Sequence, residues 1–284
     1  MNYFTRIFIS AVFSCIFVSF CWGSTSADDP PYGIASYHFF HIRDTLNKGI
    51  IHEEDFQLVF DAGKSAYSSF TKHIQDSVFL AKIEASERSG SSHTDMGIFT
   101  PVTTDQIYTL QSKHMQYINK NFDNQNYLIK EDLEQTNWKV MQETKTILGY
   151  PCQMARGMCK GREYTAWFTT DISAGFGPWK LHGLPGLILE AYDDRQMIKF
   201  TCTKVMLDVK ASGNQILDLP KDVITTTYRD YERMENAFMQ GLDIGEFSGG
   251  EAVVEKVEVD QGIQTKLQRK VRINYPLELD QVKK

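Results

Sequence analysis

The stretch GFGPWKLHGLPGLILEAY, Gly175–Tyr192, decides the fold that we expect. Two pairs of turn-forming residues divide it, and the second pair, Pro185-Gly186, fits positions i+1 and i+2 of a type II turn. In that turn proline presets φ and glycine accepts a positive φ. The chain is therefore expected to reverse direction there. The residues that we expect to have structural roles in turns are Gly177, Pro178, Gly183, Pro185 and Gly186.

The segment after the turn predicts a strand inside a sheet. Leu187, Ile188 and Leu189 are apolar on both faces of an extended chain, which is typical of a strand that is covered on both sides. Trp179 and His182 come just before it. One interpretation makes Trp179 a plug at the end of the core and His182 a turn residue. The other places both in a ligand pocket.

The rest of the sequence predicts a mainly β fold of the α+β class. We expect an antiparallel meander sheet, in one variant an open half-barrel, with a C-terminal helix packed on it. The helix is predicted over 222–240 by apolar residues three to four positions apart, with Gly241 at its end. A short helix is expected from Thr104 to Ser112, and 86–94 is expected to be a loop. The expected strands are 34–42, 54–60, 115–122, 127–133, 137–141, 146–155, 163–170, 197–207, 252–259 and 264–273.

The N-terminus has the pattern of a signal peptide. Arg6 precedes an apolar run that ends at Trp22, and small residues follow from Gly23 to Ala27. The run is short for a membrane span of about 20 residues. We therefore expect residues 1–26 to be a cleaved signal peptide and 27–284 to be a single domain, periplasmic or secreted, with no membrane span after cleavage.

Charge and motifs exclude several classes of function. From Asp28 onward the chain has 29 basic and 36 acidic residues, which argues against a nucleic-acid partner. Neither a GxSxG elbow nor an HExxH helix nor a dinucleotide glycine fingerprint occurs. On a strand, His38 and His41 point to opposite faces, so we expect no metal site there. No cofactor is expected.

Three cysteines follow the signal peptide: Cys152, Cys159 and Cys202. An oxidising compartment permits a disulfide, and an odd number leaves one thiol over. A bond from Cys152 to Cys202 would join two strands, and a bond from Cys152 to Cys159 would close a small hairpin. All three could also be reduced and buried, since free cysteine behaves as a small apolar residue.

The sequence resembles a known family of exported proteins. GLPGLI at 183–188 resembles the signature of the GLPGLI family of Bacteroidetes, and KTILGYPC at 145–152 and GREYTAWFT at 161–169 look similar in the same order. GPWK at 177–180 and NYPLEL at 274–279 extend this resemblance over most of the chain. The resemblance implies export and a β-rich fold. It brings no established catalytic residues.

These features favour a non-enzymatic envelope protein that binds or carries an apolar ligand or docks an envelope protein. The expected ligand-binding residues are Trp167, Trp179 and His182. Trp167 lies on the face of its predicted strand that mixes an indole with polar groups. The alternative is a periplasmic hydrolase with a site near His182 and Asp193.

Overall fold

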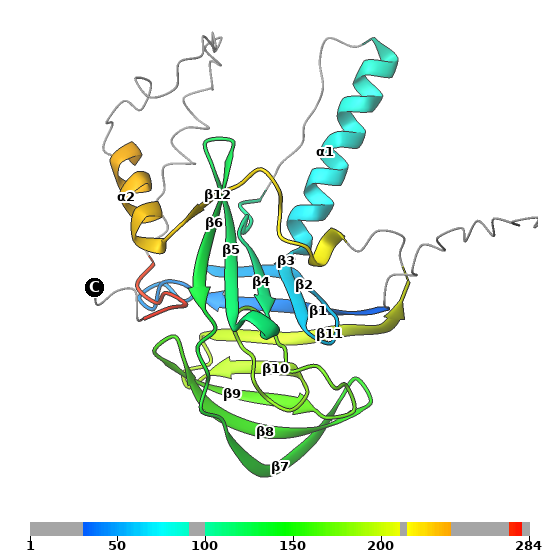
Figure 1. Cartoon of the computed structure of the whole chain (residues 1–284), viewed down its shortest axis with the longest axis vertical. Coiled ribbons are helices and arrows are strands. Elements are labelled where there is room, and N and C mark those ends of the chain that lie inside the picture. The colour runs from blue at the N-terminus through cyan, green and yellow to red at the C-terminus, as the bar shows by residue number, and fades with distance from the viewer. Residues whose placement is uncertain (1–30, 91–99, 211–214, 240–272, 280–284) are drawn as a thin grey trace, which may run out of the picture.

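The computed structural model describes residues 31–90, 100–210, 215–239 and 273–279, which form one open twelve-stranded sheet and two α-helices (Figure 1). Across the sheet the strand order is β12-β6-β5-β4-β3-β2-β1-β11-β10-β9-β8-β7. Neighbouring strands are antiparallel except for β12, which runs parallel to β6. The expected mainly β, antiparallel fold with a C-terminal helix is confirmed. None of the described helices is both long and apolar enough to cross a membrane.

The elements have the following bounds. The first six strands are β1 (Tyr32–Ile42), β2 (Ile51–Phe60), β3 (Lys64–Ser69), β4 (Gln106–Leu110), β5 (Met115–Phe122) and β6 (Gln125–Asp132). The others are β7 (Lys139–Ile147), β8 (Tyr150–Cys159), β9 (Arg162–Thr169), β10 (Leu187–Asp193), β11 (Ile198–Val209) and β12 (Ile224–Thr226). The helices are α1 (Phe70–Ser89), α2 (Tyr228–Met239) and the short 3-10 helices η1 (Gln111–Lys113) and η2 (Gln215–Leu217).

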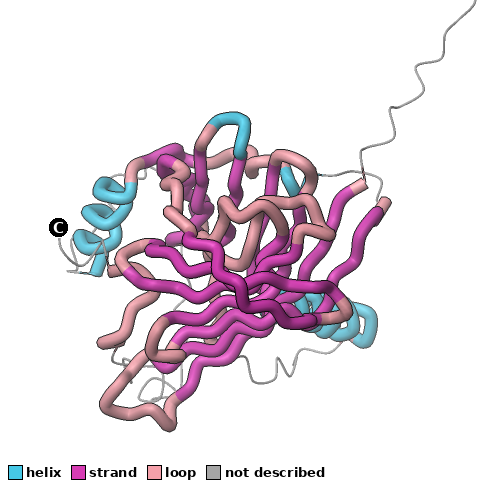
Figure 2. Tube along the Cα trace, turned by 90° about the horizontal axis from the view of Figure 1, so that it is seen from below, coloured by secondary structure: helices cyan, strands magenta, loops and turns pink. Residues whose placement is uncertain are grey.

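The sheet is twisted and curved. In Figure 1 the strands β4 to β6 run steeply across the direction of β1, β2, β10 and β11. Figure 2 shows the strands as a curved layer with α1 and α2 at opposite margins. Such curvature follows from the right-handed twist of each strand, which accumulates across a wide sheet.

The core lies against the middle of the sheet, where the decisive segment ends. Leu187, Ile188 and Leu189 are all 0% exposed, which confirms that this strand is covered on both sides. Tyr37 of β1 donates its hydroxyl to the carbonyl of Ile188 at 2.7 Å. Phe200 of β11 stacks on Trp179, with ring centroids 6.4 Å apart. Aromatic packing therefore fixes the long loop between β9 and β10 against the strands.

The turn before β10 differs from the expected type II turn. Gly186 does not have a positive φ, whereas Gly183 has φ 89°. Gly186 is required for another reason, since a Cβ atom on it would lie 1.9 Å from the carbonyl oxygen of Thr169. The backbone of β9 approaches so closely that no side chain fits.

Helix α1 was not predicted from the sequence. We expected a loop at 86–94, but the helix runs to Ser89, and 91–99 lies outside the described residues. No residue of α1 is buried, so it lacks the apolar stripe by which helices are recognised. Its two ends have the residues typical of helix caps. Ser69 accepts a hydrogen bond from the amide of Lys72, and Gly90 ends the helix with φ 65°.

Two other local expectations are wrong. The helix expected from Thr104 is the strand β4, which hydrogen-bonds to β3 on one side and β5 on the other. The single strand expected over 146–155 is the end of β7 and the start of β8, joined by a tight turn in which Leu148 has φ 51° and Gly149 has φ 86°. Pairing with neighbours overrode local propensity in both places. The expected strands at 252–259 and 264–273 and the signal peptide at 1–26 lie outside the described residues.

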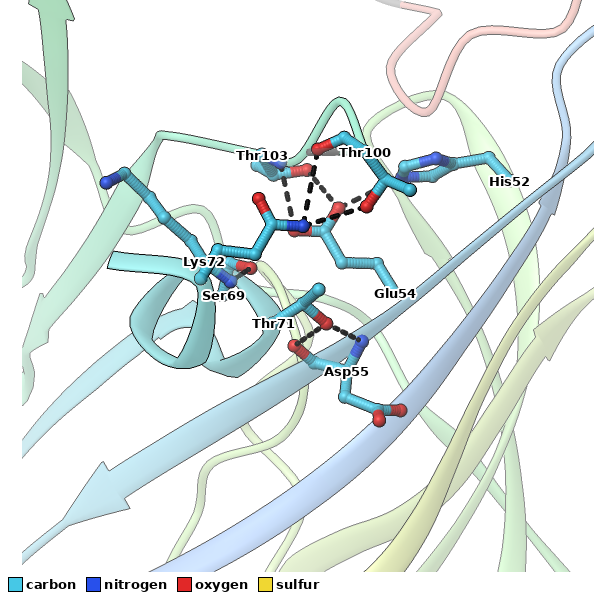
Figure 3. A network of polar contacts seen from close by, with 9 residues as sticks. His52, Glu54, Asp55, Ser69, Thr71, Lys72, Thr100 and Thr103 are labelled. Carbon is cyan, nitrogen blue, oxygen red and sulfur yellow. Dashed lines mark hydrogen bonds and ion pairs between the residues drawn. The ribbon is translucent and has the colours of Figure 1, made fainter. Parts of the chain in front are cut away.

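A buried carboxylate fixes the start of α1 (Figure 3). Glu54 of β2 is 3% exposed and accepts hydrogen bonds from the amide of Thr103 at 2.9 Å and its hydroxyl at 2.8 Å. His52 donates to the same carboxylate at 3.0 Å. Burial alone would raise the pKa of Glu54, but the hydrogen bonds from His52, Ser69 and Thr103 outweigh it and lower this pKa.

We expect Glu54 to contribute stability that is lost in acid. Its folded pKa lies below the ordinary 4.5, so the contribution is complete above that pH and disappears as the pH falls through the folded value. Glu54→Gln should lower the free energy of unfolding at pH 7 by about 1 to 3 kcal/mol. It should also lose less further stability on acidification than the wild type. Urea unfolding at pH 7 and in acid measures both, and equal acid losses in the two proteins would contradict this account.

We expect Gly186→Ala to be strongly destabilising, because the new methyl group meets backbone atoms of β9 that cannot move away independently. The free energy of unfolding should fall by about 3 kcal/mol. Gly63→Ala is the matched control, since a Cβ atom there meets nothing within 4 Å. Thermal and urea unfolding compare the two variants, and similar stabilities would show that the close approach is unimportant.

Candidate functional site

The candidate site is centred on a buried lysine. Lys180 lies in the loop between β9 and β10, and its side chain is 2% exposed. Its ammonium group is 2.9 Å from a carboxylate oxygen of Glu131 and 2.8 Å from one of Glu278. Glu131 is near the end of β6, and Glu278 belongs to the segment 273–279, which we call the C-terminal strap. Three distant parts of the chain therefore meet at one charge.

A second lysine extends this cluster. Lys160, in the turn between β8 and β9, lies 3.3 Å from Glu134 and 3.7 Å from Glu131. Burial alone would lower the pKa of Lys160, but the charges of Glu131, Glu134 and Glu278 outweigh it and raise this pKa. Lys160 therefore keeps its positive charge among these carboxylates.

A pocket of about 400 Å³ opens beside Lys180, and we call it the ionic pocket. Its walls come from β4 and β5, from the loop that carries Trp179, from α2 and from the C-terminal strap. The volume falls within the range of about 300 to 1,000 Å³ that is typical of ligand sites. The side chains that give it chemical character are Asp105, Lys120, Trp179, Lys180, Tyr228 and Glu232.

Lys180 also lines a smaller hollow of about 40 Å³, and we call it the side hollow. His182, Glu134 and Lys160 are among its lining residues. Burial, and then the charge of Lys160, lower the pKa of His182 from 6.5. The imidazole is therefore neutral at neutral pH and can accept a proton.

Backbone hydrogen bonds hold the loop that carries Trp179, Lys180 and His182. The amide of Gly183 donates to the carbonyl of Gly175 at 3.0 Å, and the indole of Trp138 donates to the carbonyl of His182 at 2.8 Å. Trp179 has φ 56°, a conformation that is uncommon for a residue with a side chain. This turn directs the indole and the following lysine into the interior.

The C-terminal strap is held by a second set of contacts. The imidazole of His41 donates to the carbonyl of Tyr275 at 2.7 Å, and Arg162 donates to the carbonyl of Pro276 at 2.9 Å. The guanidinium of Arg162 also lies 3.7 Å from the centroid of the Tyr275 ring. Tyr275 donates its hydroxyl to Asp193. Burial lowers the pKa of His41 to about 4, so this imidazole is neutral over the physiological range.

The structure brings together two of the three expected ligand residues. Trp179 and His182 lie in one loop and both face hollows around Lys180. Trp167 lies on β9, on the face opposite to that of Tyr164, Ala166 and Phe168. The ammonium of Lys145 is 4.3 Å from the centroid of its ring. Trp167 therefore does not share the pocket.

Asp193, expected near His182 in the hydrolase alternative, has a different environment. It is 0% exposed, and its carboxylate accepts from the amide of Ile198 at 2.9 Å and from the hydroxyl of Tyr275. These contacts close the turn between β10 and β11 and anchor the strap. Asp193 therefore has a structural role, whereas His182 lines a hollow.

Sequence reasoning missed Lys180, Glu131 and Glu278. One signal was available: a lysine between Trp179 and Leu181, in a stretch predicted to be interior, needs a buried partner. The partners lie 49 and 98 positions away in the sequence, so no local pattern identifies them.

All three cysteines are buried and free in the structure, so the disulfide considered between Cys152 and Cys202 is not formed. Burial raises the pKa of the Cys159 and Cys202 thiols to about 12. The arrangement agrees with the third interpretation, in which the cysteines pack as small apolar residues.

We expect the buried ion pair of Lys180 and Glu278 to be strongly coupled. Lys180→Met should lower the free energy of unfolding by about 3 to 5 kcal/mol, because it leaves carboxylates without their partner. Adding Glu278→Gln should recover part of this loss, with a coupling energy of about 0.5 to 3 kcal/mol in a double-mutant cycle.

The control cycle uses Lys64 and Asp218, an exposed pair 3.4 Å apart, for which the coupling should be no more than about 1 kcal/mol. Urea unfolding of the single and double variants gives both energies. Additive effects at Lys180 and Glu278 would contradict the assignment of a buried pair.

The fold is similar to that of solved structures of PNGF-II. The structure of PNGF-II in the C2 space group matches with a TM-score of 0.50 and 16% identity, over 72% of this chain and 32% of that chain. The structure of PNGF-II in the P21 space group matches with the same TM-score and identity, over 72% of this chain and 33% of that chain. This chain thus spans about a third of their length, and at this identity the similarity shows the fold alone. No curated protein matches the sequence.

The comparisons correct two expectations. A family model described as "N-glycanase peptide, N-terminal domain" matches residues 63–230, so the assignment to the GLPGLI family is wrong. The expectation of a non-enzymatic carrier of apolar cargo or docking protein is also wrong, because the family belongs to N-glycanases. Because the match covers more than half of its residues, this chain belongs to the family of N-glycanase N-terminal domains.

Proposed function

We propose that this chain acts in the removal of N-linked glycans from proteins and that it holds the glycan-bearing substrate in the ionic pocket. The observation that carries the proposal is the family match over 63–230. That range includes Glu131, Lys160 and Lys180, which form the cluster beside the pocket. The family is one of N-terminal domains and the solved relatives are longer, so we assign substrate holding to this part.

The chemistry of the ionic pocket suits a polyhydroxylated ligand. Carboxylates accept hydrogen bonds from hydroxyl groups, and ammonium groups donate to hydroxyl oxygens. Glu232 and Lys120 offer one group of each kind on the pocket wall. Trp179 and Tyr228 add aromatic surface, against which the apolar faces of a ligand can pack. This combination of a few polar groups and aromatic walls is typical of specific ligand sites.

A second candidate function is hydrolysis at the side hollow, and the neutral His182 favours it. In the hydrolysis of an amide, water gives its hydroxyl group to the carbonyl carbon and a proton to the departing nitrogen. A neutral imidazole can take the proton of the attacking water as a general base. Burial and Lys160 hold the pKa of His182 below its ordinary value, and Glu134 lines the same hollow. This site includes His182, as the hydrolase alternative expected, but it has Glu134 instead of Asp193.

The signal-peptide pattern at 1–26 favours an activity outside the cytoplasm, and we include export in the proposal. Proteins in that compartment meet glycoproteins of their surroundings directly. The substrate that we propose is therefore an extracellular glycoprotein or glycopeptide.

The test is to offer the purified chain an asparagine-linked glycopeptide. Calorimetry measures binding, and mass spectrometry of the peptide measures glycan release. We expect binding, and a loss of affinity of about tenfold or more in Glu232→Ala, because a hydrogen bond to a charged group contributes about 1.5 to 3 kcal/mol. Arg233→Ala is the matched control on the same helix, since its side chain is 72% exposed and pairs with Asp230.

The outcomes separate the two candidates. Binding without release supports substrate holding, and release that His182→Ala abolishes supports hydrolysis at the side hollow. If the chain neither binds the glycopeptide nor releases the glycan, both candidates are overturned. An equal loss of affinity in Glu232→Ala and Arg233→Ala would remove the ionic pocket as the site.

A further inference from the structure

The charges around the ionic pocket and the side hollow are unbalanced. Three lysines, Lys120, Lys160 and Lys180, line these hollows. Twice as many carboxylates line them or pair directly with these lysines. The carboxylates are Asp105, Glu131, Asp132, Glu134, Glu232 and Glu278.

Each of the three lysines already has a carboxylate partner. Lys120 lies 2.8 Å from Asp105, and Lys160 lies 3.3 Å from Glu134. Lys180 is bound by two carboxylates, of which Glu278 is 2.8 Å away. Within the described part of the chain, the two hollows therefore offer an incoming anion no lysine without an acidic partner.

Two of the carboxylates have no such compensation. Glu232 and Asp132 form no ion pair with any described residue, and each lines one of the hollows. His182 does not balance them, since burial and Lys160 lower its pKa. The hydroxyl of Tyr228, on the pocket wall, is also affected by this excess of negative charge. Its pKa is raised first by burial and then by the charges of Glu232 and Glu278.

An acidic pocket of this kind discriminates between ligands by their charge. A neutral sugar exchanges hydrogen bonds with carboxylates and ammonium groups without disturbing the existing ion pairs. A ligand with its own carboxylate, sulfate or phosphate group must lie near Glu232 or Asp132, or displace Glu278 or Asp105 from a lysine. Like charges brought together in a partly enclosed site are unfavourable, and such repulsion is a common source of specificity.

We infer that the ionic pocket and the side hollow select neutral glycans and reject glycans that end in acidic sugars, with Glu232 and Asp132 as specificity-determining residues. This inference rests on the proposed function, because it names the class of glycan that the same site takes. Glu232 is exposed on α2 and Asp132 is exposed at the end of β6, so both meet a ligand as it enters.

The test compares two glycopeptides that have the same peptide and the same glycan core. One glycan ends in sialic acid, which carries a carboxylate, and the other has been desialylated enzymatically. Calorimetry with the purified chain at low ionic strength should show affinity for the sialylated form lower by about tenfold. The difference should shrink at high salt, since screening weakens repulsion between accessible charges.

Variants identify the residues responsible. The double variant Glu232→Gln/Asp132→Asn should bring the ratio of the two affinities close to one, and this ratio is the readout. Glu143→Gln is the matched control, because Glu143 is exposed on β7 and lines neither hollow. Circular dichroism of each variant checks that the sheet is intact. We expect an unchanged spectrum, because both substituted residues are exposed.

The outcomes distinguish failure of the charge selection from failure of the proposed function. Equal affinity for the two glycopeptides, or tighter binding of the sialylated one, overturns the charge selection and leaves the proposed function standing. A ratio that changes as much in Glu143→Gln as in the double variant removes Glu232 and Asp132 as its cause. Failure of both glycopeptides to bind, without release of either glycan, overturns the proposed function and the inference together.

Discussion

The ammonium group of Lys180, buried between the carboxylates of Glu131 and Glu278, is the interaction on which the candidate site depends. A buried charge is very costly without partners, so the three groups must assemble together or not at all. The requirement fixes a loop, the end of a strand and a C-terminal segment relative to one another. The ionic pocket exists because these three segments meet beside α2 without filling the space between them.

The position of Lys180 depends in turn on close backbone packing. The loop between β9 and β10 lies against the strands so tightly that Gly186 has no room for a side chain beside Thr169. Trp179, in the same loop, adopts φ 56°. Residues in such sparsely populated conformations are often found at functional sites. Stacking of its ring on Phe200 and contact with Tyr164 compensate for this conformation. Packing of the loop and placement of the charge are therefore one structural feature.

The range matched by the family model contains only part of the residues that build the ionic pocket. The matched range 63–230 contains the strands β3 to β12 and the lysines of the site. Glu278 of the strap and Tyr37 of β1 lie outside that range, although the first pairs with Lys180 and the second supports β10. The pocket therefore combines residues from the matched range with a wall from the strap that lies outside it.

The sequence by itself determined the mainly β class, the buried strand Leu187–Asp193 and the C-terminal helix, because alternation and helical spacing are local patterns. It also predicted Trp179 and His182 as candidate ligand residues, and both line hollows beside Lys180. Only the tertiary structure decided that Gln106–Leu110 is a strand and that α1 exists without a buried face, since pairing and end capping outweighed the weak periodicity there. The partners of Lys180 were likewise decided by the fold, because an ion pair between distant segments leaves no periodic trace in the sequence.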